Sequence, residues 1–195
     1  MLQEPVRSWR KLAVWWIVAN AAGWAATMGV FEALPYGFRP IACAIIGTAQ
    51  WVVLRSRLRV SPWWMAATSL AWFGGLWAGA ARADFFFGPD PSWAGGVGGA
   101  LAGILQYWTL RRRASTPLLW LPVSIVASIA GWWAGEYVGV TAYFNHLSLS
   151  WSYIIGGAIG GTAIGALSAP VLIRMVRKTV DPLCNSGDPV SLLQS

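Results

Sequence analysis

The sequence has little charge. Only 11% of its 195 residues are Asp, Glu, Lys or Arg, and 56% are apolar. Soluble domains carry about 25% charged residues, because charge covers the surface that faces water. This shortage excludes an ordinary soluble domain. The composition therefore predicts that nearly the whole chain lies in a lipid bilayer as an integral membrane protein.

Histidine, cysteine and catalytic motifs are scarce as well. Cys43 and Cys184 show no metal-ligand spacing, and the single histidine, His146, lies in the polar segment AYFNHLSLS. No acid, base or histidine stands in the middle of an apolar segment, which disfavours a proton-coupled transporter. Haem would require paired axial ligands within helices, and the chain has no HExxH or GxSxG motif. We therefore expect no metal site, no catalytic residue and no enzymatic activity.

The apolar residues fall into six segments of the right length to cross a bilayer. A helix rises about 1.5 Å per residue and the hydrocarbon layer is about 30 Å thick, so most of the six suffice, although the second is short. The predicted fold class is an all-α integral membrane domain over residues 1–178, followed by a mobile cytoplasmic tail over 179–195. The predicted transmembrane helices are 12–31, 40–54, 63–81, 93–110, 118–140 and 151–173.

Basic residues orient the predicted helices. Of the 14 Lys and Arg residues, all but Arg39 and Arg82 lie before the first segment, after the last, or in the second and fourth connections. Short cytoplasmic loops are enriched in Lys and Arg, so both termini are predicted to be cytoplasmic, in a bacterial cytoplasmic or internal membrane. The expected partners of these residues are anionic lipids at the cytoplasmic face and not nucleic acid.

A glutamine recurs at the same place in two apolar segments. IIGTAQWVVLR, residues 45–55, has a second copy in LAGILQYWTLR, residues 101–111, which aligns Gln50 with Gln106. A looser third copy has Ser168 at this place. The three copies predict three tandem helical hairpins, each running out and back across the membrane, related by an axis near the membrane normal.

Small residues share a helix face with the glutamines. Such stripes let helix backbones approach closely in a bilayer, where the hydrophobic effect does not drive association. The predicted helix zipper consists of Gly47, Gly95, Gly99, Gly103, Gly157, Gly161 and Gly165. A matching polar stripe on the other helices offers hydrogen-bond partners for the amides at Asn20, Thr68 and Ser128. The amides are interpreted as packing groups that fix helix register, with lining of a polar path or ligation of a cofactor as alternatives.

The fifteen tryptophans divide by their expected depth. Trp24, Trp72 and Trp132 lie near the middle of their segments, where they fill space or, alternatively, shape a pocket for a flat apolar ligand. Nine others are predicted to form aromatic belts at the membrane interfaces. The belt on the basic side contains Trp9, Trp15, Trp16, Trp63, Trp64, Trp108 and Trp120, and the opposite belt contains Trp93 and Trp151.

The segments GTAQWVVLR and WWMAATSLAW resemble a group of uncharacterised bacterial multipass membrane proteins. In that group a GxxQWxxLR segment precedes a basic loop and a WWxxAxxxGW helix. The resemblance covers residues 47–72 and, less closely, 103–132, where Tyr107 replaces the tryptophan. It implies a multipass architecture and brings no activity with it.

Three functions are compatible with these features. The first is a non-enzymatic polytopic protein that serves as an accessory or assembly subunit of a larger membrane complex, bound to other membrane-protein subunits. The second is a channel or facilitator for a small neutral or apolar solute, with Gln50, Gln106, Asn20 and Thr68 facing the path. The third is binding of a lipid, pigment or quinone against the deep tryptophans, although no cofactor is required by the sequence.

Overall fold

The computed structural model describes residues 4–34, 39–82, 90–112, 114 and 116–185. These residues form six α-helices and one 3-10 turn. The elements are α1 (Glu4–Ala33), α2 (Arg39–Leu58), α3 (Trp63–Ala80), α4 (Pro91–Leu110), η2 (Pro117–Leu119), α5 (Trp120–Phe144) and α6 (Leu149–Asn185). The chain is therefore all-helical over the described ranges.

Four of the helices contain segments long and apolar enough to cross a membrane, which suggests an integral membrane protein. These segments are Trp9–Phe31, Ile41–Leu58, Pro117–Phe144 and Leu149–Val176. Within the described residues α3 and α4 are not among them, because both are rich in glycine and tryptophan, which lower the mean hydropathy without adding charge.

Several helices extend beyond their predicted bounds, and in two of them the difference changes the interpretation. The second predicted helix, 40–54, is a helix of 20 residues, so it reaches about 30 Å and is no longer too short for the bilayer. The last helix continues to Asn185, so the segment predicted as a tail, 179–195, is helical as far as that residue. Residues 186–195 lie outside the described part of the chain.

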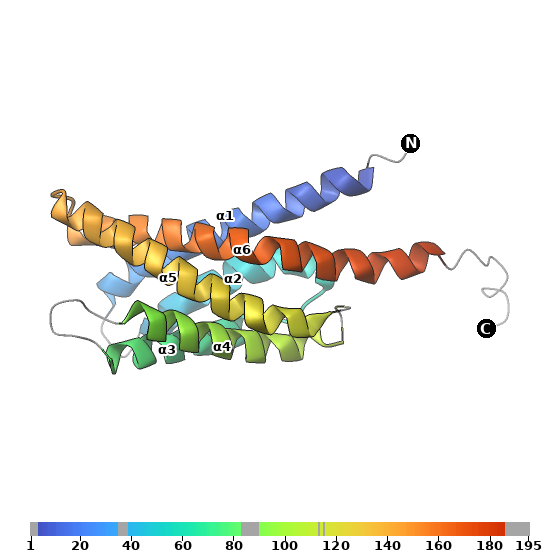
Figure 1. The fold of residues 1–195 in the computed structure, drawn as a ribbon, viewed down its shortest axis with the longest axis horizontal. Coiled ribbons are helices and arrows are strands. Elements are labelled where there is room, and N and C mark those ends of the chain that lie inside the picture. Colours follow the sequence, from blue (N-terminus) through green and yellow to red (C-terminus); the bar gives the residue numbers. More distant parts are fainter. Residues whose placement is uncertain (1–3, 35–38, 83–89, 113, 115, 186–195) are drawn as a thin grey trace.

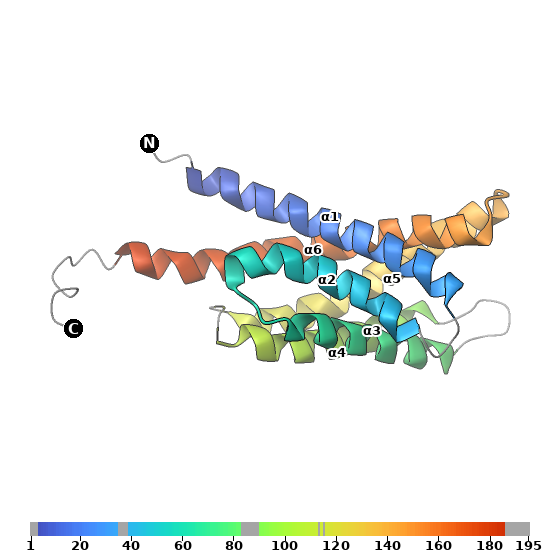
Figure 2. The same ribbon diagram turned by 180° about the vertical axis from the view of Figure 1, so that it is seen from behind.

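The six helices form a closed ring. Each helix packs against the next one in the sequence, and α6 returns to pack against α1. Both termini lie at one end of the molecule, together with the α2–α3 and α4–α5 connections (Figure 1). The view from behind shows the same antiparallel order, with α1 and α2 crossing in front of α6 (Figure 2). The predicted three hairpins are therefore arranged as α1–α2, α3–α4 and α5–α6 around a common interior.

The predicted zipper glycines of the even-numbered helices face the following helix, with α1 following α6 around the ring. A Cβ atom added to Gly47 would lie 2.9 Å from the carbonyl oxygen of Met65 in α3, and one added to Gly165 would lie 2.8 Å from the Cα of Ile17 in α1. The same relation holds for the other predicted zipper positions, where Gly95, Gly99 and Gly103 face α5 and Gly157 and Gly161 face α1. These glycines therefore let the backbones of neighbouring hairpins approach each other.

Most glycines of the odd-numbered helices face the partner helix of their own hairpin; Gly29 of α1 faces Ile154 of α6 instead. A Cβ at Gly75 would lie 2.6 Å from the Cα of Gly98, and one at Gly135 would lie 2.7 Å from the carbonyl oxygen of Gly156. Small residues thus occupy contacts within hairpins as well as between them, which lets the ring close with little space between adjacent backbones.

Two glycines on the same helix give a matched test of this packing. A Cβ at Gly99 would lie 2.7 Å from the carbonyl oxygen of Ser124 and 2.9 Å from the Cα of Ile125, whereas at Gly96 its nearest neighbour, a side-chain atom of Ile129, is 3.8 Å away. We expect Gly99→Ala to lower the free energy of unfolding in detergent by about 1–3 kcal/mol. Gly96→Ala should raise it by up to about 1 kcal/mol, because Ala is the better helix former. Equal effects of the two substitutions would contradict the close approach of α4 and α5.

Candidate functional site

Three tryptophans meet inside the ring at the level nearer the basic end. Trp16, Trp64 and Trp120 come from α1, α3 and α5 and are almost completely buried. The ring centroid of Trp120 lies 5.9 Å from that of Trp16 and 6.1 Å from that of Trp64. We call this cluster the basic-side triad. One odd-numbered helix of each hairpin therefore contributes one indole to the same core layer.

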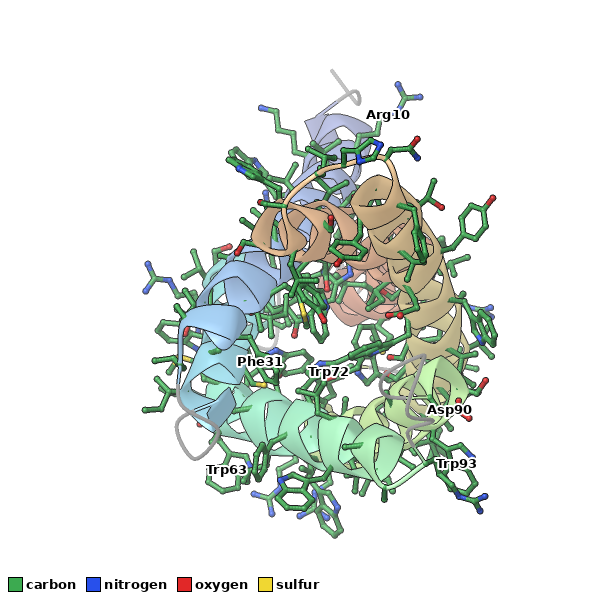
Figure 3. All side chains as sticks on the ribbon, turned by 90° about the vertical axis from the view of Figure 1, so that its left-hand side faces the viewer. Arg10, Phe31, Trp63, Trp72, Asp90 and Trp93 are labelled. Atoms are coloured by element: carbon green, nitrogen blue, oxygen red, sulfur yellow. The ribbon has the colours of Figure 1, made fainter. Side chains whose placement is uncertain are left out.

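A second layer lies further toward the opposite end. Trp24, Trp72 and Trp132 have ring centroids 4.5, 6.1 and 6.4 Å apart. Figure 3 views the bundle along its long axis and shows Trp72 pointing into the interior of the ring, whereas Trp63 and Trp93 point outward. We call this cluster the central triad. The two triads fill the middle of the bundle with aromatic rings in contact.

The structure corrects the belt assignment of three tryptophans. Trp16, Trp64 and Trp120 were expected at the lipid interface, yet they are core residues. A sequence signal for them exists, because Gln50 and Trp64 are separated by the same 14 residues as Gln106 and Trp120. The other belt positions that are exposed in the structure are Trp15, Trp63, Trp93, Trp108 and Trp151.

Both buried glutamines use their amide oxygen and nitrogen. Trp64 Nε1 donates to Gln50 Oε1 at 3.2 Å, and Gln50 Nε2 donates to Asn20 Oδ1 at 2.9 Å. Gln50 therefore ties α2 to the helix before it and to the helix after it. Because a buried amide without partners costs several kcal/mol in an apolar surround, this double pairing removes the penalty of placing it there.

Gln106 repeats the arrangement one hairpin later. Trp120 Nε1 donates to Gln106 Oε1 at 2.7 Å, and Gln106 Nε2 donates to Thr68 Oγ1 at 2.8 Å. The hydroxyl proton of Thr68 goes to the carbonyl oxygen of Trp64 at 2.9 Å. Asn20 in the first hairpin likewise donates to the carbonyl oxygen of its own helix, at Trp16. Each side-chain nitrogen and hydroxyl in these two sets therefore donates to at least one acceptor.

The third hairpin breaks the pattern. Ser168 Oγ accepts from Trp16 Nε1 at 2.8 Å but donates to the carbonyl oxygen of Ile164 in its own helix at 2.7 Å. Ser124 follows Trp120 by four residues, as Asn20 follows Trp16, and its buried hydroxyl has no partner. Ser128 was predicted as a further partner of the amides, but the two amide nitrogens donate to Asn20 and Thr68. Ser128 lies instead with its Cβ near Gly99 of α4 and bonds neither glutamine.

The chemistry available inside the ring is neutral. The buried polar side chains are amides, hydroxyls and indoles, and no group of three His, Cys, Asp or Glu residues able to hold a metal occurs in the described residues. Two indole nitrogens of the central triad, Trp24 Nε1 and Trp132 Nε1, are buried without a partner. Among the described residues, the buried side chains include no Asp, Glu, Lys, Arg or His, so this interior can hold helices together and accept a neutral ligand.

Comparisons of this chain with protein-family models, curated proteins and solved structures found no match. The resemblance to uncharacterised bacterial multipass proteins therefore stays a prediction.

The indole-to-amide bond can be tested with one substitution and a matched control. Trp120→Phe removes the donor to Gln106 and leaves its buried oxygen unpaired, which should lower the free energy of unfolding by about 1–3 kcal/mol. Trp63→Phe keeps an aromatic ring at an exposed position of α3 and should change stability by less than about 0.5 kcal/mol. Thermal unfolding of both variants in the same detergent gives the comparison. A harmless Trp120→Phe would show that the bond contributes nothing.

Proposed function

We propose that this chain is a six-span integral membrane protein with both termini in the cytoplasm, in a bacterial cytoplasmic or internal membrane. We propose further that it acts as an accessory or assembly subunit of a larger membrane complex, bound to other membrane-protein subunits, and not as an enzyme. The observation that carries this proposal is that the interior is occupied by the chain's own side chains, which leaves the outer surface for interactions.

Support for six spans comes from the ring. α3 and α4 lie between α2 and α5 and run alongside them (Figure 1), so a membrane crossed by α2 and α5 would surround α3 and α4 too. Arg55 and Arg111, at the end that holds both termini, lie 4.9 and 3.9 Å above the rings of Trp51 and Trp108. Cations beside tryptophans are typical of the membrane interface. A third pair, Arg82 over Trp93 at 4.8 Å, lies at the opposite end, so such pairs support two interfaces. The excess of Lys and Arg at the end with the termini supports a cytoplasmic location for that end.

Support for a subunit role comes from the outer end of the third hairpin. The tip of α5 and α6 extends beyond the ends of α3 and α4 (Figure 1). Its exposed aromatic side chains include Tyr137, Tyr143, Phe144 and Trp151. An aromatic surface suits contact with a partner subunit, since aromatic residues are enriched in the buried cores of protein interfaces. We propose this tip as the surface that contacts a partner subunit.

The two alternatives fare differently. A polar path along the ring has little support, because each amide already bonds the two neighbouring helices and two layers of touching tryptophans lie across the interior of the ring. Binding of a pigment, quinone or lipid has one specific observation in its favour. The unpartnered indole nitrogens of Trp24 and Trp132 could each donate to a carbonyl or hydroxyl group of such a ligand.

Purification from native membranes in mild detergent tests the subunit role. We expect other membrane proteins to co-purify at fixed stoichiometry, and Tyr143→Ala combined with Phe144→Ala to release them while the bundle stays folded. Val126→Ala, an exposed apolar change elsewhere on α5, is the control and should release nothing. A chain that purifies alone would overturn the proposal, and an extractable pigment or quinone in that sample would favour the ligand-binding alternative.

Cysteine labelling in intact cells tests the orientation. Cys184→Ser leaves Cys43, which is fully buried, as the remaining native thiol. In that background we expect a membrane-impermeant reagent to label Asn145→Cys, in the α5–α6 connection, and to spare Ser56→Cys at the basic end until the membrane is opened. Labelling with the opposite preference would reverse the assigned topology.

A further inference from the structure

We propose that the third hairpin holds a small neutral hydrogen-bonding ligand, about the size of one or two water molecules. It would lie between Ser124 of α5 and Ser168 of α6. This is the place that a glutamine amide fills in each of the other hairpins. The inference concerns the interior and does not depend on the proposed subunit role.

The register of the helices places these two serines side by side. In the third hairpin Gly135 faces Gly156 and Gly131 faces Gly160, so antiparallel pairing puts residue 124 opposite residues 167 and 168. The first hairpin follows the same rule, because Gly23 faces Ile46 and Asn20 bonds Gln50. Ser124 and Ser168 are therefore the third copy of the pairs Asn20–Gln50 and Thr68–Gln106.

The third copy lacks the atoms that would join its two members. A serine side chain has three fewer non-hydrogen atoms than a glutamine side chain. The hydroxyl of Ser168 also donates its proton to the carbonyl oxygen of Ile164 in its own helix. Ser124 is only 7% exposed and its hydroxyl has no partner. A water molecule takes up about 30 Å³ and is held in protein interiors by two to four polar groups. The proposed ligand would take the place of the missing amide between these two polar groups.

The hydrogen-bonding capacity that remains on the two serines defines the chemistry of the ligand. Ser168 Oγ has spent its proton on Ile164 and one lone pair on Trp16, so a ligand must donate to its second lone pair. The Ser124 hydroxyl can either donate or accept. Water and the hydroxyl or amide group of a small molecule meet both conditions, whereas an isolated ketone does not. The neutral surroundings disfavour an ion.

Four versions of the chain test the site through their thermal midpoints in detergent: the wild type, Ser124→Ala, Ser168→Gln and the double variant. Ser124→Ala should lower the midpoint by about 2–4 °C, because the ligand loses a partner. Ser168→Gln should restore the amide found in the other hairpins and raise the midpoint. Added to Ser168→Gln, Ser124→Ala should again lower the midpoint, because the new amide needs Ser124 as acceptor.

A thermal midpoint that rises or stays unchanged in Ser124→Ala would overturn the proposal, because removing a buried hydroxyl that has no partner stabilises the protein or leaves its stability unchanged. The Ser124→Ala measurement remains informative even if Ser168→Gln fails to fold.

Two further measurements distinguish the sources of the ligand. Water-to-protein cross-relaxation by NMR at Ser124, with no organic compound in extracts, identifies water. A hydroxyl- or amide-bearing compound that is extracted from the wild type and absent from Ser168→Gln identifies a small molecule. Finding neither would also contradict the site.

Discussion

The hydrogen bond from a tryptophan indole to a buried glutamine amide is the constraint on which the rest of the bundle depends. An amide in an apolar interior is stable only if its oxygen and its nitrogen both find partners. Gln50 and Gln106 meet this requirement by accepting from the helix that follows and donating to the helix that precedes. Each amide therefore specifies the order of three helices, and two such amides specify the order of five.

The remaining features make that bond geometrically attainable. Glycine stripes bring helix backbones close enough for short side chains such as Asn20 and Thr68 to reach an amide on the next helix. The indole rings supply both the donors and the bulk that fills the ring, so polar pairing and space filling come from the same residue. Where Ser168 replaces the amide, Trp16 still donates across the contact between α1 and α6. The hydroxyl of Ser124 in α5 is then left without a partner.

Periodicity in the sequence predicted the three hairpins, the glycine contacts between helices and two of the amide partners. It could not decide between adjacent tryptophans. Trp15 is 62% exposed and Trp16 is 1% exposed, yet the two residues are adjacent and identical. Trp16 bonds Ser168, 152 residues away, so no local pattern marks it, whereas a spacing of 14 residues from a glutamine marks Trp64 and Trp120. Periodicity also placed Ser128 among the partners of the amides, because residues four apart share one helix face and the pattern does not fix which of them meets the next helix. Closure of the ring by α6 against α1 depends on packing over the whole chain and leaves no local signal.

A double-mutant cycle between Trp64 and Gln50 tests the central constraint most directly. It compares the stabilities of Trp64→Phe, Gln50→Leu and the double variant with the wild type, and repeats the cycle with exposed Trp63→Phe in place of Trp64→Phe. The account predicts a coupling energy of about 0.6–2 kcal/mol for the bonded pair and a value near zero for the control pair. Equal coupling in the two cycles would contradict it, because the indole-to-amide bond would then not be what fixes the order of the helices.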